Sequence, residues 1–474
     1  MTVDLVAYGL AALLVVGWWL RFIVRREEER FFRRLLLLAA AAKVLGTLLR
    51  YGVMSDLYAR GDFRRYLING RVIADQLRDG EWPAEAGELG TPFMDFLSGV
   101  AYTFLPYSLV AGFAFFSLLS FIGAYLFFLA FRTAVTGGDA KRYAVFIFFT
   151  PTMLFWPSSL GKEAWLVFTL GIASYGAARV LKRLRGGYLL VALGIAAMFA
   201  VRPHMGALFA LAFAGAYALR FRDPEIKKSA IAWLIGLVVV GVGAGLVATN
   251  FGDELPRDES IEGGAAQQIF AETERRTATG GASFDSRPVR GPGDLVHAVV
   301  TVPFRPFPWE GHNVQAVMAG LEGFVLLLIV LFSLPRLAAL PTRALKQPYV
   351  AMATAYSLGF IVAFSNVGNF GILTRQRAQL IPLLLVLVCI PPLGTKLRER
   401  RRTRSPLLVA AGPRDAPASA TTGAGPLLLT APEQATVSAS TEQVPVGGRG
   451  HLDGTVDGEG VGDPGPPGDS EPPT

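Results

Sequence analysis

The sequence contains few of the residues that build metal centres or disulfide frameworks. Its single cysteine, Cys389, lies in an apolar segment, so neither a disulfide nor a thiolate metal site is expected. The four histidines, which are too far apart along the chain to support a metal cluster, are His204, His297, His312 and His451. No cofactor is expected. Charged residues make up only 17% of the 474 residues, against 52% hydrophobic. This composition predicts an integral membrane protein.

Apolar segments of about 15 to 25 residues recur from Leu5 to Pro391, as the hydrocarbon core of a bilayer requires of helices. We predict an all-α polytopic protein with about eleven transmembrane helices. The first segment lacks a basic start and a cleavage site and is interpreted as a retained span. The shorter stretch 93–106 is interpreted as a helix on the outer membrane surface, with a twelfth crossing as the alternative. The predicted spans are 3–22, 35–53, 108–131, 143–157, 164–181, 187–202, 205–220, 230–250, 315–335, 348–365 and 379–395.

The net charge of +8 does not indicate a nucleic-acid partner, because Lys and Arg are not gathered on one soluble face with aromatic residues. Instead they cluster in alternate short loops, which the positive-inside rule assigns to the cytoplasm. This orientation predicts an outside N-terminus and a cytoplasmic C-terminus. The Ala-, Arg- and Gly-rich composition favours a bacterial plasma membrane. The clusters fall within 21–34, 132–142, 182–185, 220–228, 336–346 and 396–404.

Three parts of the chain are expected to differ in organisation. Residues 1–34 form an added N-terminal span and a basic cytoplasmic loop. Residues 35–395 form a transmembrane, catalytic-type domain with outer loops at 54–107 and 251–314. Residues 396–474 form a basic stretch and a tail rich in Pro, Gly, Ala, Ser and Thr, which is predicted to be disordered.

Polar residues that hydropathy does not explain fall on the predicted outer side. In the loop after the second span, Asp62, Tyr66 and Gly70 are spaced by four, so a helix would place them on one face. Asp62 could then act as a general base at the lip of a membrane crevice. Alternatively, Asp62 could pair with Arg65 or cap the helix that starts near Phe63.

A second unusual stretch, FWPSSLGKEAW, places Lys162 and Glu163 in a long apolar run directly after a turn. The helix N-terminus and Lys162 together could bind a phosphate on the outer side. The alternative is structural: Ser158 or Ser159 caps the helix, Glu163 complements the helix dipole, and Lys162 extends toward the membrane surface.

Further arginines stand on the predicted outer side, against the usual charge bias. Arg202 ends one span, with His204 just inside the next helix, and is interpreted as an anion ligand. Arg375 and Arg377 begin the last span and suit a phosphate or diphosphate group, with lipid head-group contact as the alternative.

The long outer loop contains two different parts. Residues 251–294 are polar and are interpreted as a partly ordered flap. Residues 300–313, VTVPFRPFPWEGHN, alternate proline with aromatic residues and are interpreted as an extended acceptor platform with Arg305 and Glu310 as polar contacts. The alternative is that Trp309 simply belongs to an aromatic belt at the membrane surface.

Together, the Asp-x-x-x-Tyr-x-x-x-Gly pattern of the first outer loop, the FWPSSLGKE turn and the final LTRQR segment resemble the GT-C superfamily of polytopic glycosyltransferases. The resemblance covers roughly residues 35–395. It implies transfer of a sugar, with inversion, from a polyprenyl-phosphate donor to a glycan or lipid acceptor on the extracytoplasmic side. The resemblance implies that Asp62 is the catalytic base. It also implies that the ligands of the lipid phosphate are Lys162, Arg202, Arg375 and Arg377.

Other functions stay open from the sequence. A Wzy-type polysaccharide polymerase would depend on Arg202, Arg305 and Arg375 and not on Asp62. A lipid-linked oligosaccharide flippase or other transporter would distribute charges through its spans and use paired broken helices. A non-catalytic membrane scaffold is the last alternative. Membrane lipids are expected partners in every case, and no protein partner is indicated.

Overall fold

The computed structural model describes residues 24–56, 61–219, 286–311 and 314–394, with the single residues Gly17, Arg21 and Phe284. All of them belong to the unit Met1–Ala411. Every regular element among these residues is a helix, which confirms the predicted all-α class. Three predicted segments lie wholly or almost wholly outside the described residues: the span 230–250, the span 3–22 and the tail 396–474. Most of the predicted flap, 251–283 and 285, lies outside them as well.

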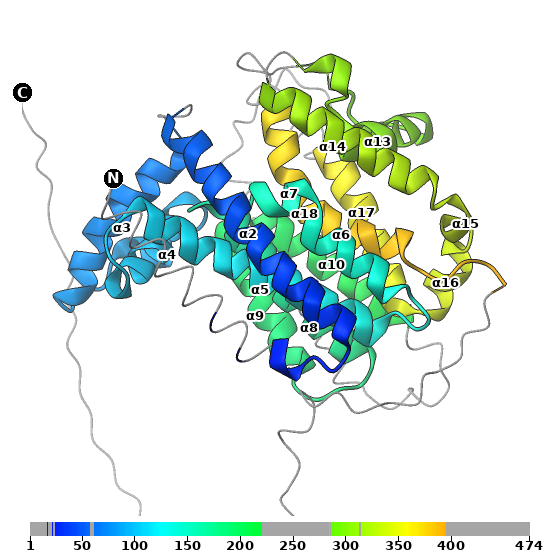
Figure 1. Ribbon diagram of the computed structural model, residues 1–474, viewed down its shortest axis with the longest axis horizontal. Coiled ribbons are helices and arrows are strands. Elements are labelled where there is room, and N and C mark those ends of the chain that lie inside the picture. The colour runs from blue at the N-terminus through cyan, green and yellow to red at the C-terminus, as the bar shows by residue number, and fades with distance from the viewer. Residues whose placement is uncertain are drawn as a thin grey trace, which may run out of the picture. The chain divides into compact units, whose positions relative to one another are not determined.

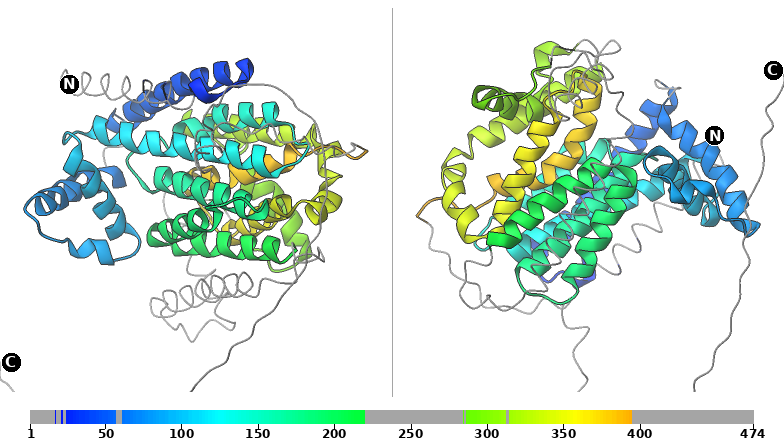
Figure 2. Two further views of the ribbon diagram at one scale, coloured as in Figure 1. Left: turned by 90° about the horizontal axis from the view of Figure 1, so that it is seen from below. Right: turned by 180° about the vertical axis from the view of Figure 1, so that it is seen from behind.

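The described helices form a bundle with a helical pair beside it (Figures 1 and 2). In chain order they are η1 (Val24–Arg26), α2 (Arg30–Asp56), α3 (Asp62–Arg78), η2 (Ala84–Gly87), α4 (Thr91–Phe104), α5 (Leu109–Ala134), α6 (Ala140–Phe149), α7 (Pro151–Phe155), α8 (Lys162–Leu181), α9 (Gly187–Val201), α10 (Pro203–Leu219), α13 (Pro292–Phe304), η5 (Pro308–Glu310), α14 (Val314–Leu331), α15 (Leu334–Leu337), α16 (Leu340–Lys346), α17 (Pro348–Phe364) and α18 (Phe370–Val388).

Several of these helices suit a membrane. Those long and apolar enough to cross one are Arg30–Ser55, Leu109–Ala134, Lys162–Leu181 and Phe370–Val388. Shorter apolar helices accompany them: Gly187–Val201, Pro203–Leu219, Ala316–Leu331 and Pro348–Phe364. Each corresponds to a predicted span, although the last span begins at Phe370 and not at 379, because Asn369 caps it through a bond to the Ile372 amide. These helices therefore support a polytopic membrane protein.

One predicted span, 143–157, is wrong as a single helix. The chain leaves helical geometry at Thr150, and Pro151 starts the short helix α7, as proline favours the first turn. The break exposes backbone groups that two charged side chains satisfy. Lys43 Nζ donates to the Met153 carbonyl at 3.0 Å, and Glu322 accepts bonds from the Thr152 amide and hydroxyl at 2.6 and 2.7 Å. Lys43 and Glu322 are isolated in the sequence, but in the structure they bond the backbone where the helix is interrupted.

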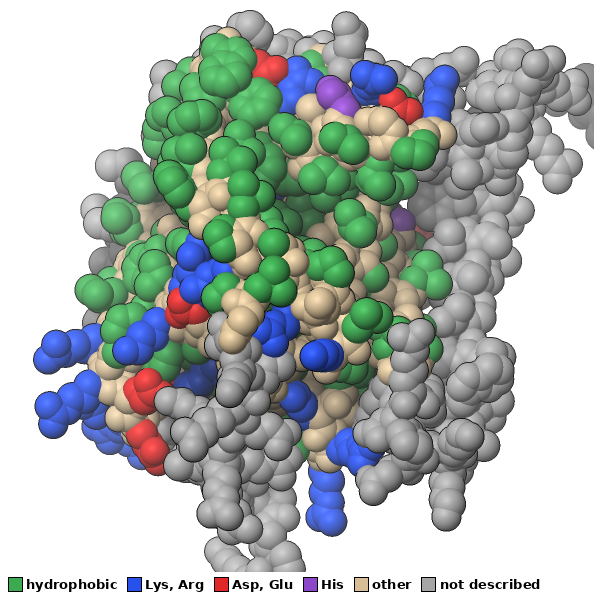
Figure 3. Space-filling view, turned by 90° about the vertical axis from the view of Figure 1, so that its right-hand side faces the viewer, with side chains coloured by type: hydrophobic (Ala, Val, Ile, Leu, Met, Phe, Trp, Pro, Cys, Tyr) green, Lys and Arg blue, Asp and Glu red, His purple; other side chains and the backbone are tan. Residues whose placement is uncertain are grey.

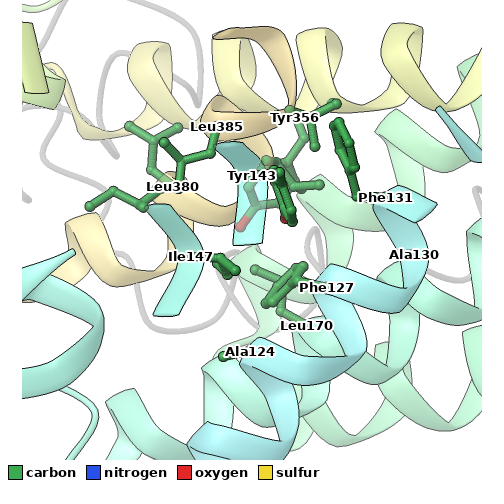
Figure 4. Close-up of a cluster of buried hydrophobic side chains, with 14 of the residues drawn as sticks. Ala124, Phe127, Ala130, Phe131, Tyr143, Ile147, Leu170, Tyr356, Leu380 and Leu385 are labelled. Atoms are coloured by element: carbon green, nitrogen blue, oxygen red, sulfur yellow. The ribbon is translucent and has the colours of Figure 1, made fainter. Parts of the chain in front are cut away.

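The core lies where α5, α6, α8, α17 and α18 meet (Figure 4). Phe131 of α5 stacks on Tyr143 of α6, with ring centroids 4.3 Å apart. The Tyr143 hydroxyl donates to the Pro382 carbonyl of α18 at 3.0 Å, so this buried phenol is satisfied. Close packing of this kind holds helices together where lipid removes the hydrophobic driving force between them.

The described basic loops meet at one end of the bundle, as the topology predicts. Arg336, before α16, bonds the Ile390 carbonyl after α18 at 2.9 Å and the Asp139 carboxylate before α6 at 3.2 Å. Lys182, after α8, donates to Thr136, after α5, at 3.1 Å. On the face seen in Figure 3, Lys and Arg side chains gather mainly in the lower half, and hydrophobic side chains dominate the upper half.

At the opposite end, α3 and α4 pack as a helical pair beside the bundle (Figures 1 and 2). The pair can approach closely because a Cβ on Gly70 would lie 3.0 Å from Ser98, and one on Gly99 would lie 2.2 Å from Ile73. Phe63 of α3 is buried edge-on against Phe113 of α5, which joins the pair to the bundle. The predicted surface helix at 93–106 is therefore a helix, α4, that packs on α3.

Candidate functional site

Polar side chains from several helices converge at the end of the bundle that carries α3 and α4. They come from the end of α2, the starts of α3, α8 and α18, the middle of α4, and the junction of α9 and α10. We call this set the polar cluster: Arg50, Asp62, Arg65, Tyr66, Asp95, Lys162, Glu163, Arg202, Arg375 and Gln376.

The start of α8 brings Lys162 and Glu163 to the cluster. Gly161, in extended backbone with φ 168°, is the N-cap residue and provides no side-chain cap. Ser158 is buried and its hydroxyl donates backward to the Leu154 carbonyl at 2.5 Å, so the predicted serine cap is wrong. Lys162 Nζ donates to the Thr91 hydroxyl of α4 at 2.7 Å. This hydrogen bond to α4 fixes the position of the Lys162 ammonium group in the cluster.

Arg202 links three helices at the junction of α9 and α10. Its guanidinium lies 3.6 Å from the Glu163 carboxylate, and each of the two side chains is 16% exposed. The same guanidinium donates to Gln376 Oε1 of α18, an oxygen that also accepts a bond from Gln379 at 2.6 Å. Arg202 is thus fixed in place while remaining partly accessible from outside.

Asp62 is the first residue of α3, and its side chain is exposed. The N-cap is Gly61, without a side-chain cap, and Arg65 bonds Asp95 at 2.9 Å and not Asp62. Both structural alternatives for Asp62 are therefore wrong. Its carboxylate lies close enough to Lys162 and Arg202 to interact with them electrostatically.

Asp95 is a cluster residue that sequence reasoning missed. It is 1% exposed, and its Oδ2 accepts bonds from Arg65 Nε at 3.0 Å and Asn69 at 3.1 Å. A lone carboxylate within the apolar stretch 93–106 is the signal that could have indicated it. Nearby, burial raises the pKa of Tyr66 well above its usual range, with a further contribution from Asp62, so this phenol stays neutral.

Two further arginines add positive charge. Arg50, also missed from the sequence, is 4% exposed and lies over the rings of Phe155 and Trp156 at 4.8 and 4.6 Å. Arg375 is half-buried, with its Nε bonded to the Gly371 carbonyl at 3.0 Å. Both lie within electrostatic range of Glu163.

Among the described residues, the cluster holds more cationic than anionic side chains. Arg65 and Asp95 form an ion pair. The other cationic side chains are Arg50, Lys162, Arg202 and Arg375, and the other carboxylates are Asp62 and Glu163. Partly buried cations such as Lys162, Arg202 and Arg375 suit a phosphate group, which carries about −1.5 to −2 near pH 7.

The structure places other predicted site residues away from the cluster. Arg305 and Glu310 form a closed ion pair at 2.5 Å, and Arg305 also lies over the rings of Phe284 and Phe370. Arg377 is 1% exposed and donates to the Arg305 carbonyl.

His204 is exposed at the start of α10, at the edge of the cluster. It lies within electrostatic range of Arg202 and Lys162. Its ring is 6.2 Å from the ring of Phe364.

The predicted extended platform at 300–313 is wrong for the part of it that is described. The first residues of that stretch belong to α13, which continues through Pro303, and Pro308–Glu310 forms the turn η5. Trp309 is 73% exposed and stacks on Phe307 with ring centroids 5.0 Å apart. His312 and Asn313 lie outside the described residues.

The cluster offers an exposed carboxylate beside fixed cations, which suits proton transfer coupled to stabilisation of an anion. Within the part of the chain that the structure describes, no group of three or more His, Cys, Asp or Glu is placed to hold a metal ion. Comparisons with models of protein families, with curated proteins and with solved structures find no match for this chain.

Proposed function

We propose that the chain is a membrane glycosyltransferase that moves a sugar from a polyprenyl-phosphate donor to an acceptor hydroxyl on the extracytoplasmic side. The observation that carries the proposal is the exposed Asp62 carboxylate beside a positive cluster that several helices assemble. The likeness to the GT-C superfamily noted in the sequence supports the same conclusion.

In the proposed reaction, the acceptor oxygen attacks the anomeric carbon and its proton passes to the Asp62 carboxylate. The bond between the anomeric carbon and the phosphate oxygen breaks, and the polyprenyl phosphate leaves with the bonding electron pair. Lys162, Arg202 and Arg375 stabilise the negative charge that develops on this leaving group. Fixed cations in a partly buried site supply the larger share of such catalysis, and the base contributes about 10²- to 10⁴-fold.

The fixed geometry of Arg202 supports its role as the central phosphate ligand. Glu163 and Gln376 hold its guanidinium from two sides, so little reorganisation is needed when the donor binds. Arg377, Arg305 and Glu310 are left out of the proposed ligand set because Arg305 pairs with Glu310 and Arg377 donates to the Arg305 carbonyl.

The test is transfer of label from a synthetic polyprenyl-phosphate sugar to cell-envelope glycan by the full chain in proteoliposomes. Asp62→Asn should lower transfer by about 10²-fold or more while the chain still binds the donor. Arg202→Gln should weaken donor binding by about tenfold, as loss of a charge-assisted bond predicts. Arg64→Gln, on the same helix as Asp62, and Asp79→Asn, at the C-cap of that helix, change exposed residues and are the matched controls; both should transfer at the wild-type rate.

Two results would contradict the proposal. Undiminished transfer by Asp62→Asn would remove the base and favour a polymerase that depends on arginines alone. Movement of the lipid-linked sugar across the bilayer, without a new glycosidic bond, would assign the cluster to a flippase.

A further inference from the structure

A second polar site lies on the α3–α4 pair, away from the polar cluster. It is a pocket of about 200 Å³ lined by Arg71, Ala74, Asp75, Arg78, Tyr102 and Tyr107. Arg71 is nine residues beyond Asp62 on α3, which corresponds to about 14 Å along the helix axis. The pocket therefore does not belong to the site already described.

Most of the charged groups of the pocket are already paired. Arg78 pairs with Asp75 at 2.9 Å, so the charges of these two side chains neutralise each other. Arg78 also donates to the Tyr102 carbonyl at 2.5 Å. Arg71 differs: its guanidinium stacks over the Tyr107 ring at 4.9 Å, and no described residue accepts a hydrogen bond from it. The pocket thus presents one oriented guanidinium with unused donors.

The surroundings of the pocket are those of a membrane surface. Tyr107 lies directly before Ser108, the N-cap of α5, so it stands at the end of a helix that is long and apolar enough to cross a membrane. Ile68 and Val72, on the same exposed face of α3 as Arg71, are 60% and 55% exposed. Phe104, at the end of α4, is 84% exposed. Tyrosine and arginine at a span end, with apolar side chains beside them, are typical of the bilayer interface.

We propose that this pocket binds the phosphate head group of an anionic membrane lipid, with Arg71 as the phosphate ligand. The planar guanidinium donates two hydrogen bonds to the phosphate oxygens, and Tyr107 holds it in the required orientation. Ile68, Val72 and Phe104 contact the acyl region of the same lipid. Binding here fixes the α3–α4 pair against the membrane surface, and it does not depend on the proposed transferase activity.

The experiment is native mass spectrometry of the full chain in detergent, titrated with phosphatidylglycerol or phosphatidylcholine. Wild type should bind phosphatidylglycerol more tightly. Arg71→Gln should bind it about tenfold more weakly and lose the preference, and Arg71→Lys should retain the preference. Arg64→Gln, an exposed arginine of α3 outside the pocket, is the matched control and should behave as wild type. Equal thermal unfolding of Arg71→Gln and Arg64→Gln shows that both variants fold.

Three outcomes would overturn the proposal. The first is an Arg71→Gln variant that binds phosphatidylglycerol as wild type does. The second is soluble glycerol phosphate binding as tightly as the lipid, because the apolar contacts would then contribute nothing. The third is displacement of the lipid by a neutral oligosaccharide, which would assign the pocket to a glycan.

Discussion

The crossing of α5 and α8 gives a direct test of the architecture, because two glycines set how closely these helices approach. A Cβ placed on Gly123 would lie 2.5 Å from the Val167 carbonyl oxygen, and one on Gly171 would lie 2.6 Å from the Gly123 carbonyl oxygen. Ordinary contact begins near 3.4 Å. The change Gly123→Ala therefore requires the two backbones to separate by about 1 Å, at a cost of about 1–3 kcal/mol.

The matched control is Gly215→Ala in α10, where an added Cβ meets nothing within 4 Å. Alanine there should stabilise the chain by up to about 1 kcal/mol through helix propensity. Thermal unfolding can be followed with a thiol-reactive fluorophore, because Cys389 is the single cysteine and is fully buried. Gly123→Ala should unfold several degrees below Gly215→Ala, at about 2–4 °C per kcal/mol. Equal midpoints would refute the close crossing of α5 and α8.

Two further predictions concern carboxylates. Asp95→Asn leaves Arg65 without its counter-charge and should cost about 1–2 kcal/mol of stability by thermal unfolding, whereas the exposed Asp79→Asn should cost nothing measurable. For Glu310, burial acts to raise the pKa, but hydrogen bonds from Arg305 and a backbone amide outweigh it and lower the pKa overall. This pairing stabilises the fold above the unfolded pKa of about 4.3 and is lost below it, so Glu310→Gln should reduce the drop in unfolding temperature on acidification. An unchanged drop would contradict the assigned pairing.

Much of the architecture follows from local patterns in the sequence. The apolar run after Lys162 predicts α8, and the spacing of Asp62, Tyr66 and Gly70 predicts the face of α3. The helix break before α7 could have been predicted as well, since Pro151 favours a first helical turn. Hydropathy predicts too late a start for α18, because the polar Thr-Arg-Gln-Arg stretch in its first turns lowers the local hydropathy.

The candidate site was only partly accessible to sequence reasoning. The charge bias of the loops predicts that Lys162, Arg202 and Arg375 face the same side of the membrane, and the structure gathers them in one cluster. The contribution of Arg50 could not be predicted, because it depends on packing against the distant rings of Phe155 and Trp156. The lone carboxylate of Asp95 in an apolar stretch could have been noticed, but its bond to Arg65, 30 residues away, depends on tertiary packing. Periodicity and charge bias predict which side of the membrane a residue faces. Only tertiary packing shows which side chains bond one another.

The most direct test of the central claim is an experimental structure of the full chain in a lipid nanodisc with bound polyprenyl phosphate. The account predicts phosphate density within hydrogen-bond distance of Arg202 and next to Lys162 and Arg375, with the Asp62 carboxylate facing the adjoining space. Density for the phosphate at any other site, with the cluster closed to the ligand, would contradict the account.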